Sequence, residues 1–310
     1  MEYIIFVAAM AALIWGADFI IRESERIALH YNISHFVIGA TLIGFGTSLP
    51  EMAASMMASW YEKPDMAVAN VVGSVTLNIT LVLGAVFFLA KKMNPDRDLF
   101  NMDSAWILFP VIVFFLITYD GVIGRFDGMI FVLLMGAYLY FLFSTDGTEL
   151  AEEIDESLEK APFGWGKSIA LLLFGFAMTI GGAHFVVESG SEIARSLGVS
   201  EWLIGLLLIS FGTSLPELVV SLVALKKGSA DLSIGNIIGS NVANFSMVLG
   251  GAALIRPLVV NTGNQFDIYV MMAASLALLL ILANKLYSKA GGIFLLMILS
   301  LFIQNAVQHG

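Results

Sequence analysis

The sequence predicts an all-α integral membrane protein with ten transmembrane helices, arranged as two inverted five-helix repeats with broken helices at the midplane. Composition gives the first reason: of 310 residues, 58% are hydrophobic and 13% charged, and the mean hydropathy is +0.88. A soluble domain of this size could not bury so much apolar surface. The second reason is near-continuous apolar runs of about twenty residues, which fit helices; an outer-membrane barrel needs alternating segments of about ten. The third is a seven-residue motif that occurs twice.

Ten apolar segments are long enough to cross a bilayer. The first lies at the N-terminus, where Met1 and Glu2 provide neither the basic start nor the cleavage site of a signal peptide, so we expect a retained helix. In chain order the expected spans are 3–22, 34–60, 65–90, 104–120, 126–145, 168–190, 200–225, 231–255, 267–285 and 290–307. The absence of cysteine excludes disulfides and thiolate metal sites.

The longest connection divides the chain into a first five-helix repeat, 1–145, and a second, 168–310. This linker, 146–167, is acidic; its carboxylates include Glu149, Glu152, Glu153, Asp155, Glu156 and Glu159. We interpret it as a solvated cytoplasmic tether. A regulatory Ca²⁺ site there is a minor alternative, because nothing like an EF-hand loop is present.

The two halves resemble each other at a constant offset of 166 residues, with no gap from Trp15 to Gly84 and from Gly181 to Gly250. The matched pairs include Gly16-Ala17 with Gly182-Ala183, Ser34 with Ser200, Ser55 with Ser221, Asp65 with Asp231, Asn70 with Asn236, Gly73-Ser74 with Gly239-Ser240, and Asn78 with Asn244. Because five is an odd number, the second group must enter the membrane from the opposite side. This is the inverted-repeat plan of secondary transporters, which places the binding site at the midplane between the repeats.

The basic residues predict that both termini lie outside the cell membrane. With the N-terminus outside, the cytoplasmic connections hold eleven: Arg22, Arg26, Lys91, Lys92, Arg97, Lys160, Lys167, Lys226, Lys227, Lys285 and Lys289. The outer connections hold four: Lys63, Arg125, Arg195 and Arg256. Cytoplasmic connections of membrane proteins carry the excess of Lys and Arg, so this orientation is favoured.

The repeated motif is Phe-Gly-Thr-Ser-Leu-Pro-Glu, at 45–51 and again at 211–217. Its proline has no N–H to donate and crowds the preceding turn, so we expect a broken helix with freed carbonyl oxygens around 44–47 and 210–213. Thr47 and Glu51 are four residues apart and share a helix face, with Ser48 beside them. A carboxylate at membrane depth is rarely placed there without a function.

The next helix of each half adds a polar stripe at i, i+4 spacing: Asn70, Ser74 and Asn78, and then Asn236, Ser240 and Asn244. Hydroxyl, amide, carbonyl and carboxylate oxygens form a hard-oxygen set that suits Ca²⁺ or Na⁺ and not Zn²⁺ or Cu⁺. A simpler interpretation covers part of this set, because membrane helices use Ser, Thr and Gly for close packing and Asn as interhelical glue. The two glutamates are the strongest functional candidates.

Gly-Thr-Ser-Leu-Pro-Glu in the second helix of each half, followed by Gly-Ser…Asn in the third, resembles the α-repeats of the cation/calcium antiporter superfamily. The match is best to the sodium/calcium exchanger branch, including its small prokaryotic members, and covers essentially the whole chain. It implies a secondary active antiporter, not an enzyme, that exchanges Ca²⁺ for Na⁺ by alternating access. Helices 2, 3, 7 and 8 would build the site, and the first helix of each half would slide against them.

The resemblance also implies the metal ligands. They are Thr47, Ser48, Glu51, Ser74 and Asn78 in the first half, Thr213, Ser214, Glu217, Ser240 and Asn244 in the second, and the main-chain oxygens of Gly44 and Ser210. Two carboxylates balance one Ca²⁺ or two Na⁺, so exchange of more than two Na⁺ per Ca²⁺ would be electrogenic.

We expect no cofactor; Ca²⁺ and Na⁺ are the transported ions. The lipid bilayer is the expected partner, and no nucleic acid is expected to bind. We expect the plasma membrane as location; a monomer is compatible with the sequence, which leaves the oligomeric state open.

Other functions remain open. Some family members, including potassium-dependent exchangers, carry Asp where this chain has Asn244, which argues against K⁺ co-transport. Proton/calcium exchangers usually show a Gly-Asn…Glu pattern that is absent here, so an antiporter of H⁺ for Ca²⁺, or of another divalent cation such as Mn²⁺, is the alternative. A channel would favour a ring of identical subunits. An intramembrane enzyme lacks a catalytic constellation.

Overall fold

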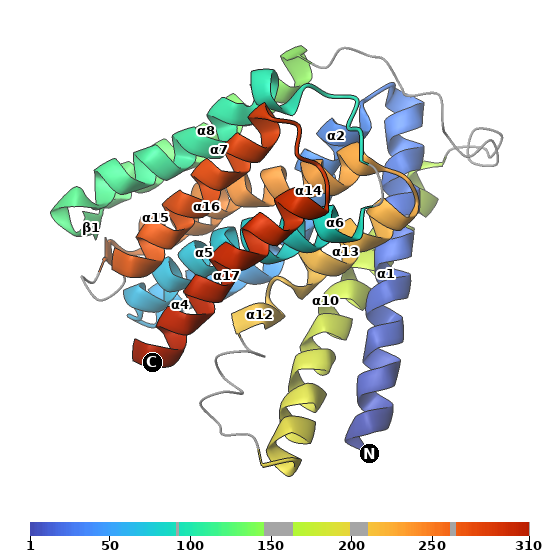
Figure 1. The fold of residues 1–310 in the computed structure, drawn as a ribbon, viewed down its shortest axis with the longest axis horizontal. Coiled ribbons are helices and arrows are strands. Elements are labelled where there is room, and N and C mark those ends of the chain that lie inside the picture. Colours follow the sequence, from blue (N-terminus) through green and yellow to red (C-terminus); the bar gives the residue numbers. More distant parts are fainter. Residues whose placement is uncertain (91–92, 146–163, 199–209, 261–264, 310) are drawn as a thin grey trace.

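The computed structural model describes residues 1–90, 93–145, 164–198, 210–260 and 265–309. Helices account for nearly all of this structure (Figure 1). The first half contains α1 (Glu2–Tyr31), α2 (His35–Ile38), η1 (Gly39–Ile43), α3 (Gly44–Thr47), α4 (Leu49–Trp60), α5 (Pro64–Leu77), η2 (Asn78–Leu83), α6 (Gly84–Leu89), α7 (Leu99–Ile117), η3 (Thr118–Asp120), β1 (Val122–Ile123) and α8 (Arg125–Thr145). The second contains α10 (Trp165–Ser196), α12 (Ser210–Gly212), α13 (Leu215–Lys226), α14 (Ala230–Ala243), η5 (Asn244–Leu249), α15 (Gly250–Ile255), β2 (Leu258–Val259), α16 (Gln265–Ala283) and α17 (Lys289–His309).

The described residues include seven helices that are long and apolar enough to cross a membrane, and an eighth if the bent pair His35–Thr47 and Leu49–Trp60 is one span. Lys289–Asn305 is a shorter apolar helix. The expected span 200–225 and the linker 146–167 lie partly outside the described residues. The expectation of a multi-span all-α membrane protein is confirmed.

Helix α1 is longer than predicted, because it continues to Tyr31 where the sequence suggested an end near residue 22. The extra turns carry Glu23 and Arg26, which form an ion pair at 3.0 Å with 2% and 9% of their side chains exposed. In this i, i+3 ion pair the two charges compensate each other within the helix. The end of α1 therefore remains helical, although its charged residues suggested a connection.

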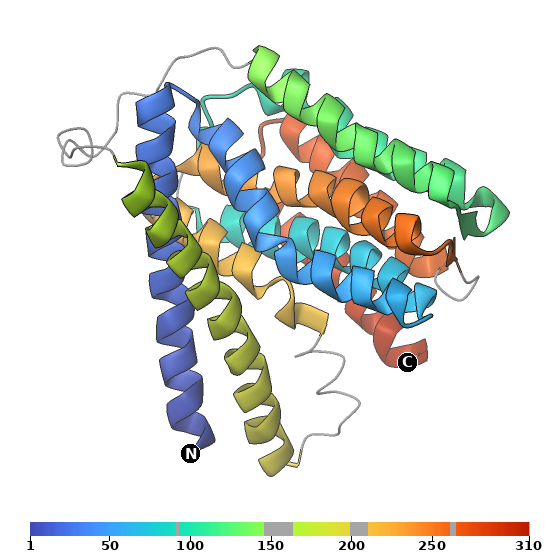
Figure 2. The same cartoon turned by 180° about the vertical axis from the view of Figure 1, so that it is seen from behind.

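Helices α1 and α10 lie side by side and cross the other helices at a steep angle (Figures 1 and 2). Their backbones approach closely at small residues. A Cβ added to Gly16 would lie 2.7 Å from the carbonyl oxygen of Gly175, and one added to Gly182 would lie 2.7 Å from the backbone nitrogen of Leu13. Small residues are the usual means by which membrane helices pack this closely.

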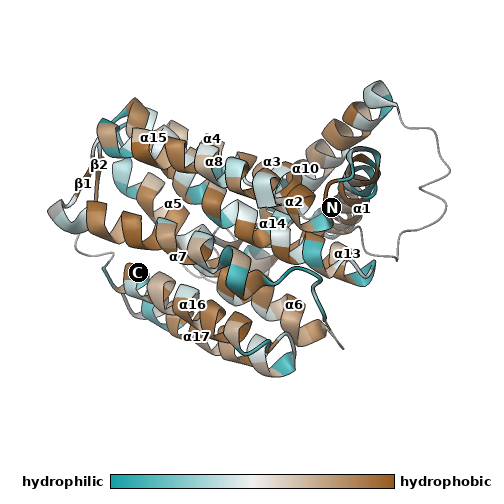
Figure 3. Cartoon of the chain, turned by 90° about the horizontal axis from the view of Figure 1, so that it is seen from above, coloured by the Kyte–Doolittle hydropathy of each residue, from teal (hydrophilic) through white to brown (hydrophobic). Residues whose placement is uncertain are grey.

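The central layer is formed by the continuous helices Pro64–Leu89 and Ala230–Ile255, whose apolar windows are 78% and 83% buried, against 28–33% for α1, α7, α8 and α10. Outer helices present apolar side chains along their length, and hydrophilic residues gather toward helix ends and connections (Figure 3). The central helices are therefore the ones enclosed by protein, and polar residues on them are shielded from lipid.

Each repeated motif interrupts its helix. Between α3 and α4 the chain bends by 44° at Ser48, and Pro50 occupies the first turn of α4, where its missing N–H is tolerated. In the second copy the helix is interrupted at Thr213 and Ser214, between α12 and α13. The expectation of broken helices at both motifs is confirmed in the described residues.

Candidate functional site

The two breaks place a carboxylate in the first turn of α4 and of α13. Glu51 and Glu217 are each 1% exposed. The N-terminal end of a helix carries a partial positive charge that favours a carboxylate at this position. The hydroxyl of Ser48 in the first motif donates to the Oε1 of Glu217 at 3.5 Å, so the first motif contacts the carboxylate of the other half.

Hydroxyl groups tie the first break to α14. The Thr47 Oγ1 lies 3.3 Å from the Oγ of Ser240 and donates at 3.3 Å to the Oδ1 of Asn236. The Gly44 carbonyl accepts from Ser240 at 3.0 Å and from Ser48 at 2.9 Å. This main-chain oxygen, expected to be free, is therefore engaged by hydroxyls in this conformation.

The first asparagine of each polar stripe holds two neighbouring helices together. Asn70 donates to the Oγ of Ser55 at 2.8 Å and to the carbonyl of Glu51 at 3.2 Å. Asn236 makes the equivalent bonds to Ser221 at 3.0 Å and to the carbonyl of Glu217 at 3.5 Å. Both halves use the same pattern, and these two amides are therefore structural.

The second asparagine of each stripe marks a change in helix geometry. Asn78 begins the π-helical segment η2, and Asn244 begins η5 at the equivalent position. Wide π turns occur frequently at functional sites, because they free backbone groups and redirect side chains. Segment η5 packs against α4, and η2 packs against α13, so each π-helical segment contacts the glutamate-bearing helix of the other half.

Several buried polar atoms in this region have no hydrogen-bond partner among the described residues. They are one oxygen of each glutamate carboxylate, the Oγ of Ser214, the Oδ1 of Asn78 and both amide atoms of Asn244. A buried polar group without a partner costs about 1–3 kcal/mol, and a charged one more. Such a concentration of unsatisfied oxygens around two carboxylates is suited to hold a hard cation.

Most of the predicted site residues are brought together at the centre of the molecule. The buried ones are Gly44, Thr47, Ser48, Glu51, Ser74, Asn78, Ser214, Glu217, Ser240 and Asn244, and Thr213 is half-buried. Ser210 begins α12, but its side-chain surroundings lie outside the described residues. The sequence analysis missed Asn241, whose side chain accepts a hydrogen bond from Asn78 at 3.1 Å.

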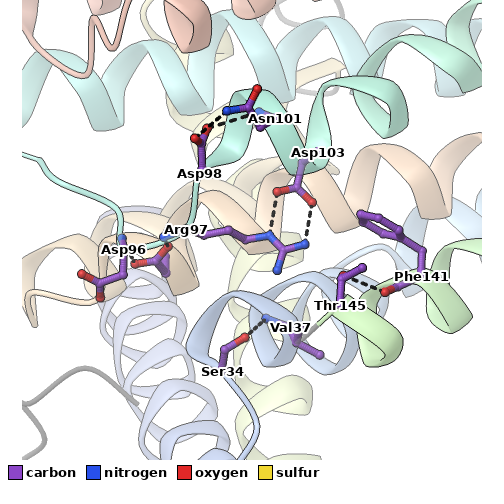
Figure 4. Close-up of polar contacts among 10 residues, drawn as sticks. Ser34, Val37, Asp96, Arg97, Asp98, Asn101, Asp103, Phe141 and Thr145 are labelled. Carbon is purple, nitrogen blue, oxygen red and sulfur yellow. Dashed lines mark hydrogen bonds and ion pairs between the residues drawn. The ribbon is translucent and has the colours of Figure 1, made fainter. Parts of the chain in front are cut away.

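A second polar cluster, around Arg97, fixes the end of α14 that lies away from these carboxylates (Figure 4). The guanidinium binds Asp103 through two hydrogen bonds of 2.7 and 3.1 Å and lies 4.5 Å from the centre of the Phe36 ring. The backbone N–H groups of Asp96 and Arg97 donate to the carboxylate of Asp231, in the first turn of α14, at 2.9 and 3.3 Å. Through this cluster α2, α7 and α14 are held together.

The sequence was compared with protein families and with known proteins. The family model for the sodium/calcium exchanger protein matches residues 1–144 and 167–306. The chain is 35% identical to the putative antiporter CaxA of Alkalimonas amylolytica, over 89% of this chain and 88% of that one. It is 30% identical to the sodium/calcium exchanger MaX1 of Methanosarcina acetivorans, over 91% of each.

The fold is also similar to a solved structure. The sodium-calcium exchanger NCX_Mj, soaked with Na⁺ and Sr²⁺, superposes with a TM-score of 0.83 at 32% sequence identity. The match covers 98% of this chain and 97% of that one. Similarity therefore extends over the whole length and includes both copies of the motif.

Proposed function

The chain belongs to the sodium/calcium exchanger family, in the prokaryotic branch of the cation/calcium antiporter superfamily, and we propose that it exchanges Ca²⁺ for Na⁺ across the plasma membrane by alternating access. The observation that carries this proposal is the pair Glu51 and Glu217, both buried, each in a copy of the same motif, with the Ser48 hydroxyl of one motif 3.5 Å from the carboxylate of the other. Buried carboxylates whose second oxygens lack partners need a cation to balance them.

We assign the transported ions to the oxygens of Thr47, Ser48, Glu51, Ser74 and Asn78, with their counterparts Thr213, Ser214, Glu217, Ser240 and Asn244, and to the carbonyls of Gly44 and Ser210. Ca²⁺ takes six to eight oxygen ligands in flexible geometry, which such a set can supply. The hydroxyls now bonded to Gly44 would rotate to release that carbonyl as ligand.

The charge of this set makes the exchange electrogenic when more than two Na⁺ replace one Ca²⁺. Because positions 78 and 244 are asparagines, the carboxylate charge comes from two glutamates. One Ca²⁺ balances them, as do two Na⁺, and a third Na⁺ bound by neutral oxygens carries one net charge, worth about 2.3 kcal/mol per 100 mV. The ion-free form would hold two uncompensated buried carboxylates, which disfavours switching without ions and so favours exchange over leak.

Contacts between the helix connections support ten helices in an inverted repeat, in which successive connections alternate between the two sides of the membrane. At one end, β1 pairs with β2, and Arg256 bonds Glu62 at 2.9 Å; both contacts join connections that the charge bias assigns to the outside. At the other end, Asp231 accepts from the backbone of Arg97, which joins two connections assigned to the cytoplasm. Each contact therefore joins two connections that are predicted to lie on the same side of the membrane.

Ion flux tests the function. We expect ⁴⁵Ca²⁺ uptake into proteoliposomes loaded with Na⁺, and none with K⁺ or choline inside. Uptake driven by an acidic interior would favour the proton/calcium alternative. Uptake that needs no counter-ion at all would indicate a channel and contradict the proposal, since a carrier stalls without a cation on the opposite side.

Cysteine labelling tests the topology. Single cysteines at Lys63 and Lys226, both exposed, should react with a membrane-impermeant maleimide from opposite sides of the membrane. The natural chain has no cysteine and provides the unlabelled control. Labelling of both positions from the same side would contradict the inverted repeat.

A further inference from the structure

Asn241 lies on α14, three residues before Asn244, and its side chain reaches the other half of the molecule. The Nδ2 of Asn78 donates to the Oδ1 of Asn241 at 3.1 Å. Asn78 is 1% exposed and Asn241 is half-buried. The bond therefore links the start of η2 to α14, two segments that carry candidate ligands from opposite repeats.

In this bond the Asn78 amide has one defined orientation. An amide has a donating NH₂ on one side and an accepting oxygen on the other. With the NH₂ held by Asn241, the Oδ1 of Asn78 remains buried without a partner among the described residues. A cation is attracted by that oxygen and repelled by the NH₂ group, so fixing the NH₂ elsewhere keeps the amide in its ion-binding orientation.

The equivalent bond is missing from the other half. The residue that matches Asn241 at the offset of 166 is Val75, which is buried and apolar. Correspondingly, neither amide atom of Asn244 has a partner among the described residues. The first asparagines of the two stripes make equivalent bonds to their neighbouring helices, whereas Asn78 and Asn244 differ.

We propose that Asn241 is a positioning residue that holds the Asn78 amide in place as a ligand, an arrangement that Asn244 lacks. This inference rests on the proposed ion site. It predicts that Asn241 acts on cation affinity only through Asn78. A packing role for Asn241 would instead change stability and leave the affinity unchanged.

A double-mutant cycle tests the proposal with Asn241→Val, Asn78→Ala and the double variant. Valine is the residue that the first half carries at this position, so the helix should accept it. We expect Asn241→Val to raise the KM for Ca²⁺ about three- to tenfold, the range of one hydrogen bond, with kcat within about twofold. The double variant should have the KM of Asn78→Ala alone, because the two residues act as one unit. Asn284→Val, at an exposed amide bonded to its own helix at 2.8 Å, is the control and should match the parent.

Equilibrium ⁴⁵Ca²⁺ binding to the purified protein should follow the same cycle and does not depend on the counter-ion. If Ca²⁺ binds but flux is driven by a cation other than Na⁺, the proposed function fails while the cycle still tests Asn241. Independent, multiplicative effects of the two substitutions would overturn the inference, as would an unchanged KM with a lower melting temperature. If Asn241→Val does not fold, Asn241→Ala removes the same acceptor and carries the same expectations.

Discussion

Replacing Glu51 or Glu217 by glutamine is expected to abolish Na⁺-driven Ca²⁺ flux while the protein stays folded. Each glutamine keeps the shape of the side chain and removes one of the two charges that balance Ca²⁺. The ion would then lie in a buried site with one charge uncompensated, which costs about 3–5 kcal/mol and corresponds to a loss of at least about a hundredfold. The measurement is ⁴⁵Ca²⁺ uptake into Na⁺-loaded proteoliposomes, with size-exclusion chromatography to confirm folding.

The matched control is Glu62→Gln. The Glu62 side chain is 70% exposed, and its partner Arg256 is 46% exposed, so the pair contributes little energy. This variant should transport like the parent. Near-normal flux in Glu51→Gln or Glu217→Gln would show that the carboxylate concerned does not balance the transported ion.

Local chemistry explains which features of the fold could be predicted. Pro50 and Pro216 break their helices because proline has no backbone N–H to donate. This property is local, so the sequence is sufficient to place the breaks. The period of four residues likewise places Asn70 and Asn78 on one helix face. These features require only the geometry of one helix.

Features that depend on distant contacts could not be predicted. The continuation of α1 to Tyr31 depends on an environment that buries the pair Glu23 and Arg26. The bond from Asn78 to Asn241 joins residues 163 positions apart, and the repeat gave no signal for it because the matching residue is Val75. The division of each stripe into a structural asparagine and an unsatisfied one also appears only when the neighbouring helices are present.

The close approach of α14 to α2 and η1 is another long-range feature, and it positions the hydroxyls of the site. A Cβ added to Gly235 would lie 2.5 Å from the carbonyl oxygen of Phe36. One added to Gly239 would lie 2.1 Å from the carbonyl oxygen of Ala40 and 2.5 Å from its Cα. These glycines are four residues apart on one face of α14, the spacing by which small residues bring membrane helices into contact. Ser240, next to Gly239, can bond Gly44 at 3.0 Å only because the backbones are this close.

We therefore expect Gly239→Ala to reduce both stability and transport severely. The added methyl would meet backbone atoms, which cannot rotate away, so α14 must move from η1 and the Ser240–Gly44 bond must lengthen or break. Overpacking of this kind costs about 1–3 kcal/mol or more. The control is Gly136→Ala on α8, at an exposed position where no described heavy atom lies within 4 Å of the added Cβ. Fluorescence-detected thermal unfolding and Na⁺-driven ⁴⁵Ca²⁺ uptake should separate the two variants, with Gly136→Ala at the parent's values and Gly239→Ala well below them. Equal melting temperatures and equal flux for both would show that α14 and η1 are not in backbone contact, and that the hydroxyls of the site are positioned by other means.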